Sequence, residues 1–116
     1  LIYKLNGPQC WYDYRFDPTM LLKDTYWNMS IWNYIISNLM ATYDLKQDKP
    51  IEAPVFLSLG IQDYLVPYTL WDDQKEKIPN LSYNLFEISG HYSFFEEEEL
   101  FRTKVIDWIE KLRNEN

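Results

Sequence analysis

One acidic residue and the only histidine of the chain stand in matched positions, each just past a glycine that follows a strand-like run. Asp63 ends the stretch LGIQD and His91 ends the stretch SGH. A carboxylate beside an imidazole can accept its Nδ1–H, fix its tautomer and stabilise the cation formed when Nε2 takes a proton. The pair could therefore serve acid–base catalysis. The alternative is that Asp63 only forms a turn and that His91 is an exposed loop residue.

The secondary-structure elements predicted around Asp63 and His91 would bring the two residues close together. Residues 55–59 are a continuous apolar run, typical of a strand covered on both faces of a parallel sheet, and residues 81–88 alternate as a second strand does. Residues 69–78 between them predict a helix. A strand–helix–strand unit joins parallel strands, whose carboxyl ends share one sheet edge. We therefore expect Asp63 and His91 to lie within hydrogen-bonding reach, roughly 2.6–3.2 Å.

Helical patterns flank this unit. A short helix is expected to start at Pro18, and residues 30–43 predict a helix of about three turns. Its apolar side chains recur at steps of four: Ile31, Ile35, Leu39 and Tyr43. A last amphipathic helix follows the run of glutamates at 96–99, which is interpreted as a solvated helix start. Its apolar face comprises Phe101, Val105, Trp108, Ile109 and Leu112.

Composition excludes several classes of function. The 116 residues allow one domain, and a net charge of −7 makes nucleic acid an unfavourable partner. No apolar run reaches the roughly 18 residues that span a membrane, and no signal peptide is visible, so we expect a soluble, cytoplasmic protein. One histidine and one cysteine, Cys10, cannot form a Cys/His zinc site, and no metal or cofactor is expected. Cys10 is interpreted as a buried thiol.

Two stretches carry a family resemblance: APVFLSLGIQDYLVP and NLFEISGHYSFFEEEELF. Together they resemble the carboxyl-terminal third of an α/β-hydrolase, most closely the proline-iminopeptidase-like branch. The resemblance implies that Asp63 is the acid and His91 the base of a Ser-His-Asp triad. It covers residues 54–112, and Glu98 stands where relatives often carry proline. The implied fold class is α/β: a partial α/β-hydrolase fold with two late parallel core strands, flanking helices and part of a helical cap.

The resemblance also divides the chain. Residues 1–46 resemble part of the helical cap (lid), and residues 47–116 the carboxyl-terminal part of the hydrolase core. In aminopeptidase members, acidic residues near the cap bind the free amine of the substrate, which makes Asp13 and Asp17 candidates. Trp11 and Tyr12 could line an apolar pocket, or they could pack the cap against the sheet.

A nucleophile is missing from the chain. The family places it in a G-x-S-x-G elbow, whereas the only glycines are Gly7, Gly60 and Gly90, and Ser93, a loop hydroxyl, is too near His91 in sequence to substitute. We therefore expect a processed or truncated fragment of a serine hydrolase, of aminopeptidase or esterase type, that is inactive alone. The intact enzyme would cleave a small-molecule ester or a short peptide with a free amino terminus.

Alternatives to this prediction stay open. The chain could be a non-catalytic binding domain derived from the same fold, or part of a parent with an aspartate nucleophile. Because the strand at 55–59 would lack a neighbour present in the parent, we also expect a homodimer or a complex with the missing amino-terminal part.

Overall fold

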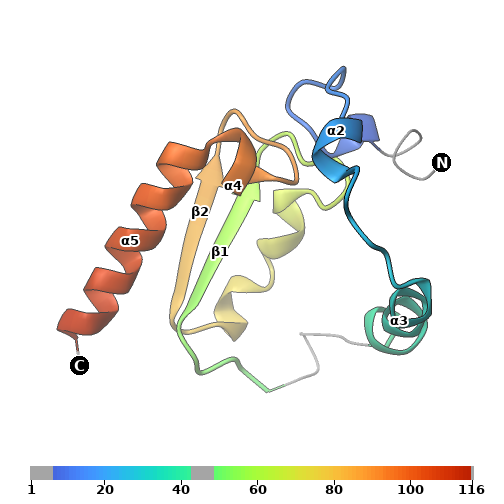
Figure 1. The fold of residues 1–116 in the computed structure, drawn as a ribbon. Coiled ribbons are helices and arrows are strands. Elements are labelled where there is room, and N and C mark those ends of the chain that lie inside the picture. Colours follow the sequence, from blue (N-terminus) through green and yellow to red (C-terminus); the bar gives the residue numbers. More distant parts are fainter. Residues whose placement is uncertain (1–6, 43–48, 116) are drawn as a thin grey trace.

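A two-stranded parallel sheet is the centre of the fold. The computed structural model describes residues 7–42 and 49–115. Strand β1 (Val55–Gly60) pairs with β2 (Leu81–Phe86), with Val55 opposite Leu81 and Gly60 opposite Phe86. Figure 1 shows both arrows pointing to the same edge of the sheet. The two strands and their parallel pairing, predicted from the sequence, are thus confirmed, although β1 is only half-buried before Leu59.

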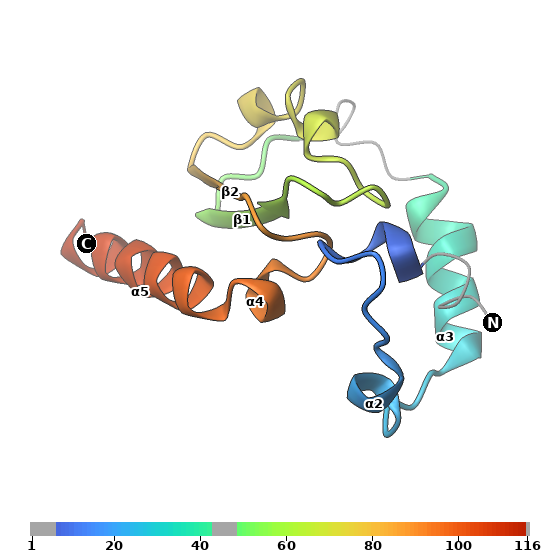
Figure 2. The ribbon, with the colours of Figure 1, turned by 90° about the horizontal axis from the view of Figure 1, so that it is seen from above.

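Helices cover one face of this sheet. The short helix α4 (Ser93–Glu96) and the long helix α5 (Glu98–Asn114) follow β2 and lie on the same side, as Figure 2 shows. The ring of Phe56 contacts the rings of Phe101 and Trp108, with centroids 5.9 and 5.5 Å apart. The predicted last helix is therefore present, but Ile109 on its expected apolar face is 45% exposed.

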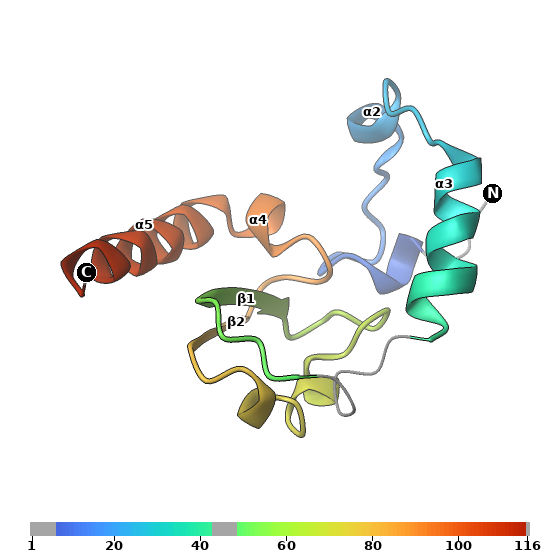
Figure 3. The ribbon, with the colours of Figure 1, turned by 90° about the horizontal axis from the view of Figure 1, so that it is seen from below.

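The other face of the sheet is covered by the segment between the strands (Figure 3). This segment forms two short 3₁₀ turns, η3 (Tyr68–Trp71) and η4 (Lys75–Lys77), so the prediction of one helix over 69–78 was wrong. Two contacts join it to β2: the Tyr83 hydroxyl donates to the Tyr68 carbonyl at 3.3 Å, and the Lys75 ammonium lies 4.0 Å from the centre of the Tyr83 ring. Tight i→i+3 turns serve as connectors of this kind.

The amino-terminal part consists of short helical segments. These are η1 (Gly7–Gln9), α2 (Thr19–Leu22), α3 (Met29–Tyr34) and the π-helical continuation η2 (Ile35–Met40). Helix α2 begins after Pro18, as expected. The Asn28 side chain caps α3 by accepting the Ile31 N–H at 3.1 Å. The helix predicted over 30–43 is thus present from 29 to 40, and Tyr43 lies outside the described residues.

The apolar side of this helix is exposed. Ile31 is 57% and Leu39 53% exposed. The predicted boundary between residues 46 and 47 lies outside the described residues, so the division into cap and core stays a prediction. Within the described ranges, no helix has the length and apolar character needed to cross a membrane.

Candidate active site

The edge where the two parallel strands end holds the predicted pair. Asp63 follows β1 by three residues and His91 follows β2 by five. The His91 Nδ1 lies 2.7 Å from the Asp63 Oδ2, within hydrogen-bonding distance. The contact predicted from the sequence is therefore present, and we call these two residues the dyad.

Asp63 uses both carboxylate oxygens. Oδ1 accepts the backbone N–H groups of Leu65 and Val66 at 2.9 Å each, while Oδ2 faces His91. Its side chain is only 5% exposed. Asp63 thus both forms the turn and contacts the histidine ring. In the neutral imidazole, a proton on Nδ1 would donate to this carboxylate and would leave the Nε2 lone pair available. The ring is 36% exposed, so a substrate or a partner group can reach it.

Two glycines let the loops of the dyad approach each other. A Cβ atom at Gly60 would lie 2.0 Å from the Gly90 carbonyl oxygen, and one at Gly90 would lie 2.4 Å from the Cys10 carbonyl oxygen. Backbone atoms occupy both places, so no side-chain movement could relieve the overlap. Glycine is required here for close approach, since neither residue has a positive φ.

A segment from the amino-terminal part runs across both loops of the dyad. The carbonyl of Gln9 accepts the Tyr64 N–H at 3.0 Å, one residue after Asp63. The carbonyl of Cys10 accepts the N–H of His91 itself at 2.7 Å. This connection could not be predicted from local sequence patterns, because its partners are more than fifty residues apart along the chain.

The glutamates at 96–99 divide into two kinds. Glu96 and Glu97 are half-buried, whereas Glu98 and Glu99 are exposed. Glu97 Oε2 accepts the Ile88 N–H at 2.9 Å and the Ser89 hydroxyl at 2.6 Å. The interpretation of the whole run as a solvated helix start was therefore wrong for its first half. The break between α4 and α5 turns these two carboxylates back toward the loop that carries His91.

Ser93 is a buried residue rather than a loop hydroxyl. It is 4% exposed at the start of α4, and its hydroxyl hydrogen-bonds the Ser58 hydroxyl on β1. The expectation of a loop hydroxyl was wrong because α4 packs directly on the sheet. A hydroxyl held in this position faces the core rather than a substrate.

The four predicted substrate-binding residues lie in different environments. Trp11 is 3% exposed and stacks on Tyr92 with ring centres 4.5 Å apart, so it packs in the core. Tyr12 is 50% exposed. Asp13 binds Arg15 at 2.9 Å, and this hydrogen bond lowers the pKa of Asp13. Asp17 accepts the Thr19 N–H at 2.9 Å and lines a hollow of about 660 Å³.

Cys10 is the buried thiol that was expected, at 8% exposure. Burial, together with the nearby carboxylates of Asp63 and Glu96, raises the pKa of this thiol above its ordinary value of 9.0. A thiol shifted in this direction is a poor nucleophile at neutral pH. Among the residues that the structure describes, no three His, Cys, Asp or Glu side chains gather as metal ligands.

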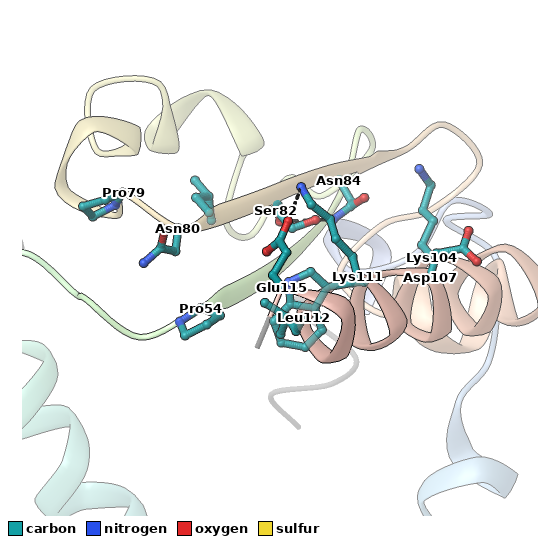
Figure 4. A pocket seen from close by; sticks show the side chains of 12 residues that line it. Pro54, Pro79, Asn80, Ser82, Asn84, Lys104, Asp107, Lys111, Leu112 and Glu115 are labelled. Atoms are coloured by element: carbon teal, nitrogen blue, oxygen red, sulfur yellow. Dashed lines mark hydrogen bonds and ion pairs between the residues drawn. The ribbon is translucent and has the colours of Figure 1, made fainter.

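A second hollow lies away from the dyad. It measures about 920 Å³ and is bordered by β2 and α5, with Lys104 and Lys111 on one wall and Asn84 on the other (Figure 4). It extends to Pro54 and Leu81, where the strands begin. Because the dyad follows the opposite ends of these strands, its geometry, rather than the size of this hollow, identifies the candidate site.

Comparison with known proteins gives two informative relatives. Over 102 residues the chain is 33% identical to "AB hydrolase superfamily protein YclE" from Bacillus subtilis (strain 168), covering 86% of this chain and 36% of that protein. Over 79 residues it is 33% identical to "Proline iminopeptidase" from Clostridium botulinum (strain Hall), covering 65% of this chain and 26% of that protein. No protein-family profile and no solved structure matches.

These similarities confirm the resemblance to α/β-hydrolases of the proline-iminopeptidase-like branch. The chain spans well under half the length of either relative. Two parallel strands flanked by helices agree with the predicted partial α/β fold.

Proposed function

For this chain, similar to α/β-hydrolases over most of its length, we propose that Asp63 and His91 are the acid and base of a Ser-His-Asp triad whose nucleophile lies outside it. The single observation that carries the proposal is the 2.7 Å contact between the His91 Nδ1 and the Asp63 carboxylate, at the carboxyl ends of parallel strands. Ligands of open α/β sheets bind at such an edge.

The proposed chemistry starts at the Nε2 of His91. As general base, Nε2 takes the proton of a serine hydroxyl while the serine oxygen attacks a carbonyl carbon, and Asp63 stabilises the imidazolium that forms. As general acid, the ring then returns the proton to the leaving alcohol or amine. Water hydrolyses the acyl-enzyme by the same route. The substrate is proposed to be a small-molecule ester or a short peptide with a free amino terminus.

The chain alone is proposed to be inactive. An acid–base pair without a nucleophile and oxyanion-hole donors lacks the largest contributions to catalysis. It is proposed to act as a homodimer or in a complex with an amino-terminal hydrolase part, and exposed apolar side chains of α3 and η2 support this. They include Ile31, Trp32, Ile36 and Leu39. Residues 1–46 are then proposed to form part of the cap.

A chimera tests the proposal. The stretch of the C. botulinum relative that matches this chain is replaced by the matching residues of this chain, and turnover of proline p-nitroanilide and p-nitrophenyl acetate is measured. We expect turnover in the chimera and a loss of about 10³-fold or more in kcat when His91 is replaced by Gln. This chain by itself, assayed in parallel, is expected to show none.

Two outcomes would contradict the proposal. Turnover that survives His91→Gln in the chimera would exclude His91 as the base. A chimera that melts cooperatively, as the intact relative does, yet turns over neither substrate would favour the non-catalytic binding domain instead.

A further inference from the structure

One glutamate joins the amino-terminal segment to the loop of the catalytic histidine. Glu96 Oε1 accepts the Tyr12 N–H at 2.7 Å, and Glu96 Oε2 accepts the Gly90 N–H at the same distance. Each carboxylate oxygen therefore serves a different part of the chain. Hydrogen bonds to a charged acceptor are shorter and stronger than neutral ones, and these two distances are typical of that class.

The bridge by Glu96 is one of several contacts that fix the same loop. The residue after Gly90 is His91, whose own N–H is held by the Cys10 carbonyl at 2.7 Å. On the side of the catalytic aspartate, the Gln62 N–H donates to the Ser89 carbonyl at 3.0 Å. The two loops of the dyad and the segment at 9–12 thus form one hydrogen-bonded unit, with the Glu96 carboxylate at its junction.

We propose that Glu96 is a positioning residue for the dyad. By holding the Gly90 N–H on one oxygen and the Tyr12 N–H on the other, it fixes the residue before His91 and the segment whose Cys10 carbonyl accepts the His91 N–H, and so directs the ring toward Asp63. This inference rests on the proposed function of the dyad, but its structural content concerns this chain alone. Glu96 reaches the reacting atoms only through the histidine, so it is not itself a catalytic residue.

An isosteric substitution separates this role from packing. Glu96→Gln preserves the size of the side chain, but the amide has one oxygen and one NH₂ group. The NH₂ group must then face either the Gly90 or the Tyr12 N–H, where a donor meets a donor. One of the two bonds is lost in either orientation, and the backbone beside His91 is released.

The single histidine of the chain gives an unambiguous spectroscopic probe. In the full chain labelled with ¹⁵N, the chemical shifts of the two ring nitrogens report which of them carries the proton in the neutral imidazole. We expect the Nδ1–H tautomer to dominate in the wild type, because Asp63 accepts that proton. In Glu96→Gln the ratio of Nδ1–H to Nε2–H tautomer should fall about tenfold, as for the loss of one charge-assisted hydrogen bond.

The matched control is Glu98→Gln, which removes the same charge from an exposed residue two positions later. It should leave the tautomer ratio unchanged. A Glu96→Gln variant with the wild-type ratio would overturn the proposal, even if its melting temperature fell. If Glu96→Gln does not fold, Glu96→Asp keeps the charge but shortens the reach by one methylene, and a wild-type ratio in that variant would overturn the proposal as well.

This measurement is independent of the test of the hydrolase. It needs no nucleophile and no turnover, so an inactive chimera leaves its result standing. Conversely, an active chimera together with an unchanged tautomer ratio would refute only the role of Glu96.

Discussion

Replacing Gly60 by alanine should separate the two loops of the dyad. The new Cβ would lie 2.0 Å from the Gly90 carbonyl oxygen and 2.3 Å from that of Ser89. Real Cβ atoms essentially never approach other atoms closer than 3.0 Å, so the backbones must part by about 3.0 − 2.0 = 1.0 Å. If this shift is passed on to the dyad, the 2.7 Å contact between Asp63 and His91 opens to about 3.7 Å. A hydrogen bond does not persist at that distance.

The energetic cost of Gly60→Ala follows from two contributions. Forcing a methyl group into an occupied space costs about 1–3 kcal/mol. Loss of the bond to the Asp63 carboxylate adds about 1.5 kcal/mol, the low end for charged partners, since the His91 ring is 36% exposed. We therefore expect the free energy of unfolding to fall by about 2.5–4.5 kcal/mol, a large part of the ~5–15 kcal/mol typical of a domain.

Urea unfolding of the full chain measures this loss, and ¹⁵N spectra of His91 report whether the Nδ1 proton is still held. Gly7→Ala is the matched control, because no atom of the described residues, 7–42 and 49–115, lies within 4 Å of a Cβ at that position. It should be neutral or stabilise by up to ~1 kcal/mol. Equal stability of the two variants, with the His91 signature intact in Gly60→Ala, would refute the close-approach argument.

Three further predictions concern the surroundings of the dyad. Trp11→Ala should cost about 3–5 kcal/mol in urea unfolding, whereas Tyr12→Ala, at an exposed neighbour, should stay within about 0.5 kcal/mol. Because the pKa of Cys10 is raised in the folded state, iodoacetamide should alkylate the native chain more slowly than the urea-unfolded chain at pH 8, and native stability should decline as pH rises above 9.0. Equal alkylation rates would contradict that shift. Light scattering at micromolar concentration should show a species heavier than a monomer, and Trp32→Ser should reduce its mass; a monodisperse monomer without a partner chain would exclude the proposed homodimer.

The parts of the fold that the sequence could predict are those set by local pattern. An apolar run followed by glycine and an acid, and a second run followed by glycine and histidine, place Asp63 and His91 at one edge once the strands are parallel. The connection between the strands is long enough for the crossover that parallel pairing requires. The internal structure of that connection did not follow, because its contacts with Tyr83 on β2 join residues far apart along the chain.

The contacts that hold the dyad in place could not be predicted, because they join residues far apart in the chain. The bond from the Tyr12 N–H to Glu96 spans 84 residues, and it uses a backbone donor that any residue other than proline would supply. The residue type at position 12 therefore cannot predict this bond. In the same way, Glu96 and Glu98 are identical letters in one acidic run, and only the break between α4 and α5 turns the first toward the loop.

Asp63 shows that one residue can both form a turn and orient a histidine. Its Oδ1 organises the turn through the N–H groups of Leu65 and Val66, and that turn fixes the carboxylate so that Oδ2 points at His91. A side chain that only formed the turn would satisfy the same local pattern, so the sequence around position 63 left both interpretations open. The contact of Oδ2 with His91 distinguishes the two interpretations. His91 lies 28 residues later in the chain, and the parallel pairing of the strands brings its loop next to Asp63. The turn after Asp63 thus holds its carboxylate in the orientation that contacts His91.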